Sequence, residues 1–276
     1  MSSCIITVIK NEHEYLDEWI QYNLNLGINH IFIFEDINSL SHKDICNKYK
    51  DNVSLSNVLT LYDYDTQQKI LINVNNLCHI QQSYFKKSLK YIYENYNYNW
   101  CFVIDIDEYI TIEDKYKNIN EVLNEYNEYD AILLTWMNFG ANGLINKPDY
   151  SKKGIIETYT KRCNFSGIDK HMWVQRIKTV YNMKHFNDNL FRSDHIPNMQ
   201  SHWCRTNYSQ NTEDLIYDKI YLRHYITKSW EEYIWKLNIR GMFYKYHRNY
   251  NSFFEMNTDM INKKEELIKM INKNRG

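Results

Sequence analysis

Proline and glycine are scarce in this chain, whose 276 residues include only two prolines and seven glycines. The sequence contains neither a Gly-x-Gly-x-x-Gly fingerprint nor a glycine-rich phosphate loop ending in Lys-Ser or Lys-Thr. A Rossmann dehydrogenase and a P-loop NTPase are therefore disfavoured. The sequence also lacks a run of about 18 apolar residues and a basic N-terminal region followed by an apolar segment, so we expect neither a membrane span nor a signal peptide.

The sequence also lacks an excess of positive or negative charge and has no paired cysteine motif. The formal net charge is −1 and the sequence pI is near 6.8, which gives no long-range attraction for nucleic acid or an anionic membrane. Six cysteines form no Cys-x-x-Cys, and Cys4 and Cys101 lie in apolar runs where they behave as small hydrophobes. These features are typical of a reduced protein, and we expect a cytoplasmic location, in the host cell if the chain is viral.

The hydrophobic pattern predicts an α/β fold. Cys4 to Ile9 reads as a buried strand, Leu16, Trp19 and Ile20 follow the helical period, and Gly27 stands where a helix would end. With a strand at residues 30–34, these elements form a β-α-β unit with a right-handed crossover. Further strands are predicted at residues 58–62, 101–104 and 130–135, and helices near residues 41–49, 76–95 and 259–274.

The most informative segment is an apolar run that ends abruptly in acids. Cys101 to Ile104 is followed by Asp105, Asp107 and Glu108, at the carboxyl end of a predicted strand, where ligands bind in open α/β sheets. Carboxylates at i and i+2 of an extended chain, ~5 Å apart, repel by roughly 3 kcal/mol at an effective dielectric constant of about 20. Mg²⁺ or Mn²⁺, shared with substrate phosphates, would compensate this charge. The alternative is that Asp105 caps the next turn and the other acids are solvated.

Several sequence blocks occur in a characteristic order along the chain. They are Lys10-Asn11-Glu12, Tyr15-Leu16-x-Glu18-Trp19-Ile20, Gly27, Asp105-x-Asp107-Glu108, Trp136-x-x-Phe139-Gly140-x-x-Gly143 and His224-Tyr225-x-x-Lys228-Ser229-x-Glu231-Glu232. Together these blocks resemble glycosyltransferase family 92 and its family 2-like relatives. The resemblance implies a GT-A fold, a mixed and mostly parallel sheet flanked by helices, over residues 1–241. Residues 242–276 would form a helical extension packed on the same domain. The implied activity is metal-dependent, inverting transfer of a sugar from a nucleotide-sugar donor, with a UDP-sugar favoured, to a hydroxyl group of a glycan, a lipid-linked sugar or a protein.

The resemblance also implies roles for individual residues. Asp105 and Asp107 would hold Mn²⁺ or Mg²⁺ on the donor diphosphate, with Asp107 as the direct ligand and His224 as a third ligand. Base and ribose would lie against the ends of the first two strands, lined by Lys10, Asn11 and Glu12 together with Asp36 or Glu35. Lys228 would share a phosphate with the amides of the helix that follows it, because helix N-termini commonly hold oxyanions. Ser229 and Glu232 also match a capping box.

The general base is the least defined role. Inverting transfer needs a group that takes the proton of the acceptor hydroxyl. Trp136 to Gly143 reads as an acceptor-side loop whose aromatic rings would stack on a sugar, but it contains no acid. Glu157 is the nearest candidate downstream, with Asp169 and Asp194 as alternatives.

Three other interpretations of the sequence stay open. His195, His202 and Cys204 could suggest zinc, although His202-x-Cys204 is too close for a usual ligand pair. A phosphatase with a nucleophilic aspartate would carry its Asp-x-Asp after the first strand, whereas here the pair follows the fourth. A non-catalytic relative would keep the fold as a glycan-binding or scaffolding module.

Overall fold

The computed structural model describes residues 1–36, 39–57, 77–163, 177–186, 201–203, 217–238 and 249–273. Packing divides the chain into two compact units. The first consists of Met1–Trp136, Arg176–Tyr208 and Ile216–Arg223, and the second of Met137–Gln175, Ser209–Leu215 and His224–Gly276. The boundary predicted at residues 241 and 242 lies outside the described residues and stays a prediction.

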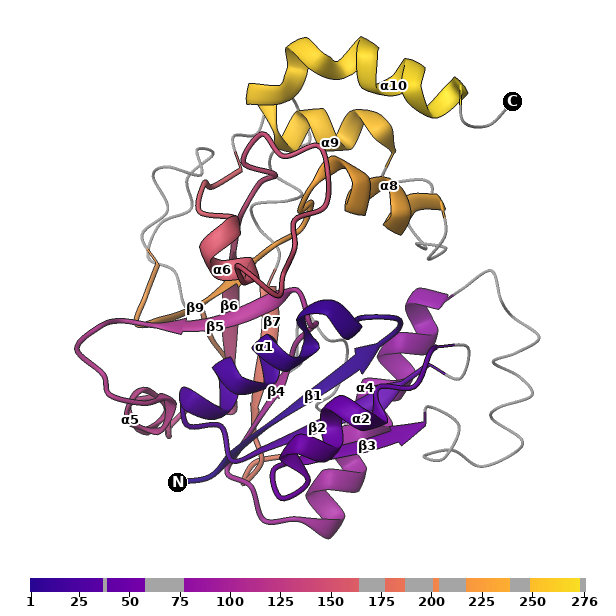
Figure 1. Ribbon diagram of the computed structural model, residues 1–276. Coiled ribbons are helices and arrows are strands. Elements are labelled where there is room, and N and C mark those ends of the chain that lie inside the picture. Colours follow the sequence, from indigo (N-terminus) through magenta and orange to yellow (C-terminus); the bar gives the residue numbers. More distant parts are fainter. Residues whose placement is uncertain are drawn as a thin grey trace. The chain divides into compact units, whose positions relative to one another are not determined.

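Nine strands of the described residues form one mixed sheet (Figure 1). Its order is β3-β2-β1-β4-β7-β6-β9-β5, with β8 paired to β6. The strands are β1 (Ser3–Ile9), β2 (His30–Glu35), β3 (Val53–Asn57), β4 (Trp100–Val103), β5 (Glu108–Ile112), β6 (Ala131–Asn138), β7 (Ile177–Asn182), β8 (Ser201–Trp203) and β9 (Ile220–His224). Strands β3, β2, β1 and β4 are mutually parallel, whereas β7 is antiparallel to β4 and β6. The predicted mixed α/β sheet is confirmed.

Helices of the first unit flank this sheet and lie in the connections between its strands (Figure 1). They are α1 (His13–Asn25), α2 (Lys43–Cys46), the 3₁₀ turn η1 (Asn47–Tyr49), α4 (Leu77–Asn95) and α5 (Ile119–Asn124). Helix α1 ends as the sequence predicts, because Gly27 takes a φ of +103° that other residues adopt only with strain. The N–H groups of Gly27 and Ile28 donate to the carbonyls of Leu24 and Asn23 at 3.0 and 3.1 Å.

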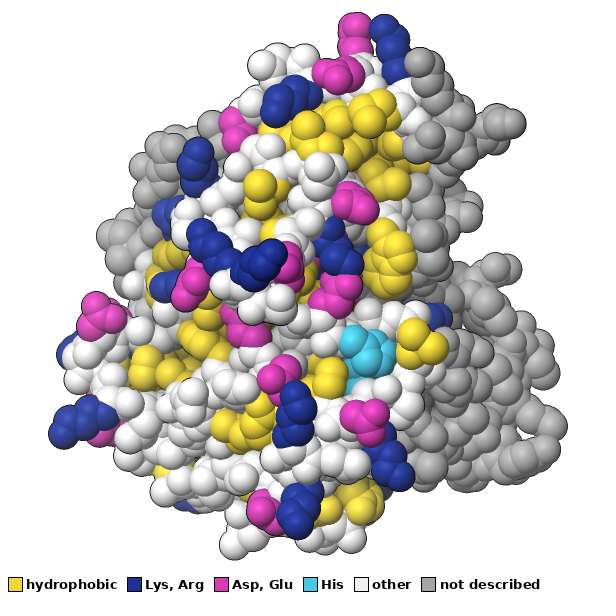
Figure 2. Space-filling view, viewed as in Figure 1, with side chains coloured by type: hydrophobic (Ala, Val, Ile, Leu, Met, Phe, Trp, Pro, Cys, Tyr) yellow, Lys and Arg dark blue, Asp and Glu magenta, His cyan; other side chains and the backbone are white. Residues whose placement is uncertain are grey.

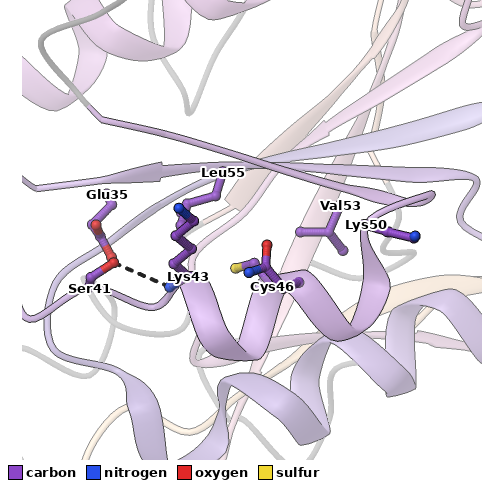
Figure 3. A pocket seen from close by; sticks show the side chains of 8 residues that line it. Glu35, Ser41, Lys43, Cys46, Lys50, Val53 and Leu55 are labelled. Atoms are coloured by element: carbon purple, nitrogen blue, oxygen red, sulfur yellow. Dashed lines mark hydrogen bonds between the residues drawn. The ribbon is translucent and has the colours of Figure 1, made fainter.

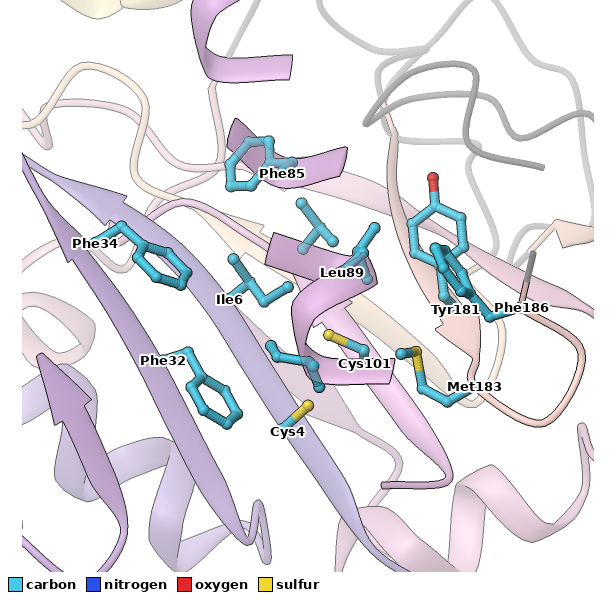
Figure 4. Packing of buried hydrophobic residues seen from close by; sticks show 12 residues of the cluster. Cys4, Ile6, Phe32, Phe34, Phe85, Leu89, Cys101, Tyr181, Met183 and Phe186 are labelled. Atoms are coloured by element: carbon cyan, nitrogen blue, oxygen red, sulfur yellow. The ribbon is translucent and has the colours of Figure 1, made fainter. Parts of the chain in front are cut away.

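The core of the first unit lies between the sheet and α4 (Figure 4). Cys4 and Ile6 of β1 and Cys101 and Val103 of β4 point to the same side, where Leu89 of α4 packs on them. Alternate residues of β1 face the other side of the sheet, and Ile5 is fully buried there. Parallel strands covered on both faces account for the continuous apolar runs in the sequence. Cys4 and Cys101 are buried free thiols, as expected, and burial raises the pKa of Cys4 well above its ordinary value.

One strand of the sheet was not predicted from the sequence, β3 (Val53–Asn57). The strand expected at residues 58–62 lies outside the described residues and stays a prediction. In β3 the apolar Val53 and Leu55 alternate with serines, which is the pattern of a strand at the edge of a sheet with one solvated face.

The second unit contains helices that pack through aromatic side chains. They are α6 (Ile155–Thr158), α8 (Trp230–Asn238), α9 (Tyr250–Met256), the 3₁₀ helix η5 (Thr258–Lys263) and α10 (Lys264–Lys273). The ring of Trp230 lies 4.9 Å from that of Phe253 and 5.1 Å from that of Phe254. The terminal helix expected at residues 259–274 is confirmed as η5 followed by α10.

Basic and acidic side chains are interspersed on the face shown in Figure 2. The two signs therefore alternate locally, as the near-zero net charge suggests. Across the described ranges, we find no helix that combines the length and the apolar composition needed to span a bilayer.

Candidate functional site

The acidic turn lies between β4 and β5, at the carboxyl end of β4. The Asp105 carbonyl accepts the N–H of Glu108 at 3.1 Å, and the Asp105 N–H donates to Glu108 Oε2 at 2.9 Å. Asp105 and Asp107 are partly exposed, whereas Glu108 is fully buried. The turn therefore presents two carboxylates at the sheet edge and uses the third acid to fix its own backbone.

A buried lysine neutralises one of these carboxylates. Lys178 lies in β7, and its Nζ is 2.8 Å from Asp105 Oδ2. The Lys178 side chain is 2% exposed and that of Asp105 is 32% exposed. Part of the positive charge expected at the acids is thus supplied by the protein itself. The sequence reasoning missed Lys178, and the available signal was a single charge within the otherwise uncharged strand Ile177–Asn182.

Glu108 differs electrostatically from its neighbours. Burial raises the pKa of the Glu108 carboxyl well above its ordinary value, and the negative charges of Asp105 and Asp107 act in the same direction. The charge of Lys178 and the hydrogen bond from the Asp105 N–H oppose this shift. Glu108 Oε1 is buried and has no hydrogen-bond partner among the described residues, and an ionised oxygen in that position is destabilising. Glu108 therefore favours its neutral form more strongly than an exposed glutamate does.

The ends of β1 and β2 meet, as the β-α-β unit predicts. Lys10 Nζ lies 3.6 Å from Asp36 Oδ2, and both side chains are about one third exposed. Asn11 takes a left-handed φ of 56°, and its Oδ1 accepts the Leu40 N–H at 2.9 Å. Lys10, Asn11 and Asp36, all predicted to line base and ribose, thus lie at the same sheet edge. Because β1 pairs in parallel with β4, this edge also carries the acidic turn.

A buried histidine, His42, links the segments that follow β1 and β2 at this edge by hydrogen bonds. His42 Nε2 accepts the backbone N–H of Glu12 at 2.9 Å, so in the neutral ring Nδ1 carries the proton and donates to Glu35 Oε1 at 2.6 Å. Burial lowers the pKa of His42, although the Glu35 carboxylate acts in the opposite direction. The Glu12 side chain, 2% exposed, accepts a short hydrogen bond from Tyr15. The structure thus gives Glu12 a part in holding the edge, whereas the sequence predicted that it would line the ligand.

A cavity of about 320 Å³ lies next to this edge, between α2, η1 and β3 (Figure 3). Val53 and Leu55 provide its apolar side and Glu35 lies at its end, while Lys43 and Lys50 contribute ammonium groups. The cavity therefore combines an apolar side with a polar rim, as sites for small molecules commonly do.

His224 belongs to the second unit and is 3% exposed. Its Nδ1 lies 3.0 Å from Asn138 Oδ1, which as a carbonyl-type oxygen can only accept, so Nδ1 donates. A neutral ring held in this way carries its lone pair on Nε2, the tautomer that a metal-binding histidine needs. The structure thus supports the ring state required for the predicted ligand role, and the role itself stays a prediction.

The amides around Lys228 have protein acceptors. Ser229 N–H donates to Tyr159 Oη at 3.0 Å and to Glu232 Oε2 at 3.2 Å, and the N–H groups of Trp230 and Glu231 donate to backbone carbonyls. The predicted phosphate contact of Lys228 therefore loses the support of these amides. Lys228 is 1% exposed with a φ of 53°, and its charge acts on Glu232. The capping box is confirmed, because the Glu232 N–H donates to Ser229 Oγ at 3.3 Å and the Ser229 N–H donates to Glu232 Oε2 at 3.2 Å.

The acceptor-side predictions have mixed outcomes. Trp136 is 5% exposed and Phe139 is 8% exposed, so neither ring offers the stacking face expected for a sugar. Trp136 extends strand β6 instead of starting a loop. Glu157 is exposed in the first turn of α6, and its role as general base stays a prediction. The alternative bases and the zinc candidates fall at positions whose side chains lie outside the described residues: Asp169, Asp194, His195, His202 and Cys204.

Among the residues that the structure describes, no three or more histidine, cysteine, aspartate or glutamate side chains are gathered closely enough to hold a metal ion. Asp105 and Asp107 thus give the turn two partly exposed carboxylates, one of which is paired with Lys178. Such carboxylates suit an ion that takes its remaining ligands from water and from substrate phosphates.

A family model named for glycosyltransferase family 92 matches residues 1–271. The chain belongs to glycosyltransferase family 92. It is therefore a glycosyltransferase, which requires a sugar donor and an acceptor, and its mixed sheet is consistent with the GT-A fold that the sequence predicted. Among solved structures, HddC from Yersinia pseudotuberculosis matches with a TM-score of 0.35 and 9% identity, over 74% of this chain and 90% of that chain. A search of curated proteins gives no match.

Proposed function

We propose that this family 92 protein transfers a sugar from a nucleotide-sugar donor to a hydroxyl group of a glycan, a lipid-linked sugar or a protein. A UDP-sugar is the favoured donor. The transfer would invert the anomeric carbon and depend on Mn²⁺ or Mg²⁺. One observation carries the donor site: the acidic turn after β4 and the polar ends of β1 and β2 lie at one edge of a parallel sheet. Ligands in open α/β sheets bind at such edges. The cytoplasmic location expected from the sequence stays a prediction.

The donor diphosphate would lie at the acidic turn. Asp107 would bind the divalent cation directly, and Asp105, already paired with Lys178, would act beside it. Hard divalent ions bind carboxylate oxygens and are usually coordinated by substrate phosphates as well. When bound, the ion would neutralise the charge that develops on the departing diphosphate. Lys10 and Asp36, which are partly exposed at the ends of β1 and β2, would contact the base and ribose.

Transfer with inversion requires that the acceptor hydroxyl loses its proton as it attacks the anomeric carbon. Glu157 is the base we propose, because its carboxylate is exposed and could be reached by an acceptor hydroxyl. His224 is proposed as a further protein ligand of the ion, in addition to the acids, because its Nδ1 donates to Asn138 and leaves the Nε2 lone pair available. Both residues belong to the second unit.

A nucleotide-binding screen tests this function. The screen measures the melting temperature with UDP, GDP and CMP, each with Mn²⁺ or with EDTA, on wild type and Asp107→Asn. A ligand at about 100 times its dissociation constant adds about 2.7 kcal/mol of stability. We expect a Mn²⁺-dependent increase with one nucleotide, lost in Asp107→Asn and kept in Asp114→Asn, a matched change at an exposed acid after β5. Equal stabilisation with Mn²⁺ and with EDTA would refute metal dependence, and the absence of any nucleotide effect in folded protein would favour the non-catalytic glycan-binding alternative.

A further inference from the structure

Lys178 is an unusual residue for its position. All six residues of β7 are buried, and the strand lies inside the sheet between β4 and β6. An ammonium group removed from water there is strongly destabilising unless it is paired. Its partner Asp105 lies on a partly exposed turn at the sheet edge. Packing alone does not explain the presence of a lysine at position 178, because apolar side chains of similar volume usually stabilise a buried position as well as an ion pair does.

Asp105 is held at three points. Lys178 Nζ binds its carboxylate at 2.8 Å, Glu108 Oε2 binds its N–H at 2.9 Å, and the Glu108 N–H binds its carbonyl at 3.1 Å. Carboxylate and backbone are therefore both fixed before any ligand arrives. Binding sites gain affinity when the contacting groups are held in advance by neighbouring residues.

The ion pair also changes the charge available to a cation. Two carboxylates two residues apart would both attract a divalent ion, but Asp105 Oδ2 is occupied by the ammonium group. The lysine charge also repels a second cation from this side of the turn. Direct coordination then falls to Asp107.

We propose that Lys178 is a positioning residue of the donor site: its buried ammonium group fixes the Asp105 carboxylate and compensates its charge, so that the divalent cation is coordinated through Asp107. This inference rests on the proposed function. Lys178 acts through Asp105 and does not touch the donor.

A double-mutant cycle tests this role. Lys178→Met, Asp105→Asn and the double variant are compared with wild type for affinity toward the nucleotide that the wild type binds with Mn²⁺, by calorimetry. Residues that act as one unit give non-additive effects. We expect each single change to weaken binding about tenfold and the double variant to be within twofold of Asp105→Asn. Binding that weakens about a hundredfold in the double variant would overturn the proposal, because Lys178 would then act independently of Asp105.

Binding of Mn²⁺ alone gives a readout that does not depend on activity. Electron paramagnetic resonance of free Mn²⁺ should show equal or tighter binding to Lys178→Met, because a repelling charge is removed, and a loss in Asp107→Asn. Weaker Mn²⁺ binding to folded Lys178→Met would overturn the proposal. Lys219→Met is the matched control, since it removes an ammonium group that pairs with Glu125 elsewhere in the same unit. It should change neither readout.

Folding and the proposed function are tested separately. If Lys178→Met does not fold, the double variant removes both charges, and its affinity is compared with that of Asp105→Asn. If the double variant and Asp105→Asn bind the nucleotide equally, and both more weakly than wild type, the proposal is supported. If the double variant binds more weakly than Asp105→Asn, the proposal is overturned. Metal-dependent nucleotide binding in wild type that is unchanged in Lys178→Met refutes the role of Lys178 alone, whereas wild type that binds no nucleotide refutes the proposed function and this role with it.

Discussion

Glu232 is the centre of a buried polar cluster whose loss should destabilise the second unit. Its Oε1 accepts the Tyr150 hydroxyl at 2.7 Å, and its Oε2 accepts the hydroxyls of Tyr159 and Ser229, both at 2.8 Å. Burial alone would raise the pKa of Glu232, but the charge of Lys228 and these hydrogen bonds more than offset it, so the pKa is lowered. The ionised form is therefore the one that the fold stabilises.

Glu232→Gln removes the charge and one of the two acceptor oxygens. With the new amide group at the Oε1 position, the hydrogen bond from Tyr150 is lost, which costs about 1.5–3 kcal/mol for a charged acceptor. The remaining bonds at the other oxygen lose their charge assistance, and Lys228 is left buried beside a neutral group. Breaking a buried charge pair costs about 3–5 kcal/mol in total. We expect a loss of unfolding free energy in that range.

Urea unfolding followed by tryptophan fluorescence measures this loss, with Glu231→Gln as the control. Glu231 is the exposed neighbour in the same helical turn, and its carboxylate accepts the N–H of Lys147 at 2.7 Å. Its replacement should cost less than about 1 kcal/mol. Because the folded-state pKa of Glu232 is depressed, its contribution is complete above the ordinary pKa of about 4.5 and disappears as the pH falls below it. A loss under about 1 kcal/mol at pH 7, or one that does not shrink in acid, would refute the charged cluster.

Three further changes test other parts of the structure. Gly140→Ala should cost about 1–3 kcal/mol by urea unfolding, because a Cβ there would lie 2.6 Å from Asn257 Oδ1, and an unchanged stability would contradict the packing. His42 has a lowered pKa, so wild type should lose stability as the pH falls below about 6.5 and His42→Gln should lose less; parallel pH profiles would argue against its neutral bridge to Glu35. Glu108 has a raised pKa, so it makes wild type less stable as the pH rises above about 4.5. With EDTA present, Glu108→Gln should therefore become more stable relative to wild type as the pH rises above about 4.5, and a constant difference in unfolding free energy would show that the carboxyl is not perturbed.

The elements that the sequence predicted correctly are those with local signals. The continuous apolar run of β1 reflects burial on both faces, and Gly27 ends α1 because a positive φ is needed there. The exit of β4 into Asp105 and Asp107 could be located for the same reason, since a buried strand and the acids that follow it are neighbours in the chain. Strand β3 was not predicted because its edge pattern is half polar, and the apolar signal in the sequence is stronger in the residues that follow it.

The charge relations of the site could not be predicted because they join distant segments. Lys178 follows Asp105 by 73 residues, and only the antiparallel pairing of β7 with β4 brings them together. His42 and Glu35 are closer in sequence, but the ring state depends on the N–H of Glu12 in another loop. Burial also decides which side chains remain accessible to a ligand, and the Trp136 ring, expected to stack on a sugar, is 5% exposed.

A positive charge was expected beside Asp105 and Asp107, and the fold supplies one charge of the two that a divalent ion would carry. The Lys178 ammonium group and the carboxylates of Asp105 and Asp107 together carry a charge of −1, and Glu108, whose pKa is raised by burial, adds less negative charge than an exposed glutamate would. One residual negative charge attracts a divalent ion weakly by itself but attracts it strongly once a nucleotide diphosphate adds its own charges. Metal and donor should therefore bind cooperatively, each raising the affinity of the other by the same factor. Calorimetry of Mn²⁺ with and without nucleotide measures that factor, and equal affinities would show that Lys178 does not limit the charge of the empty site.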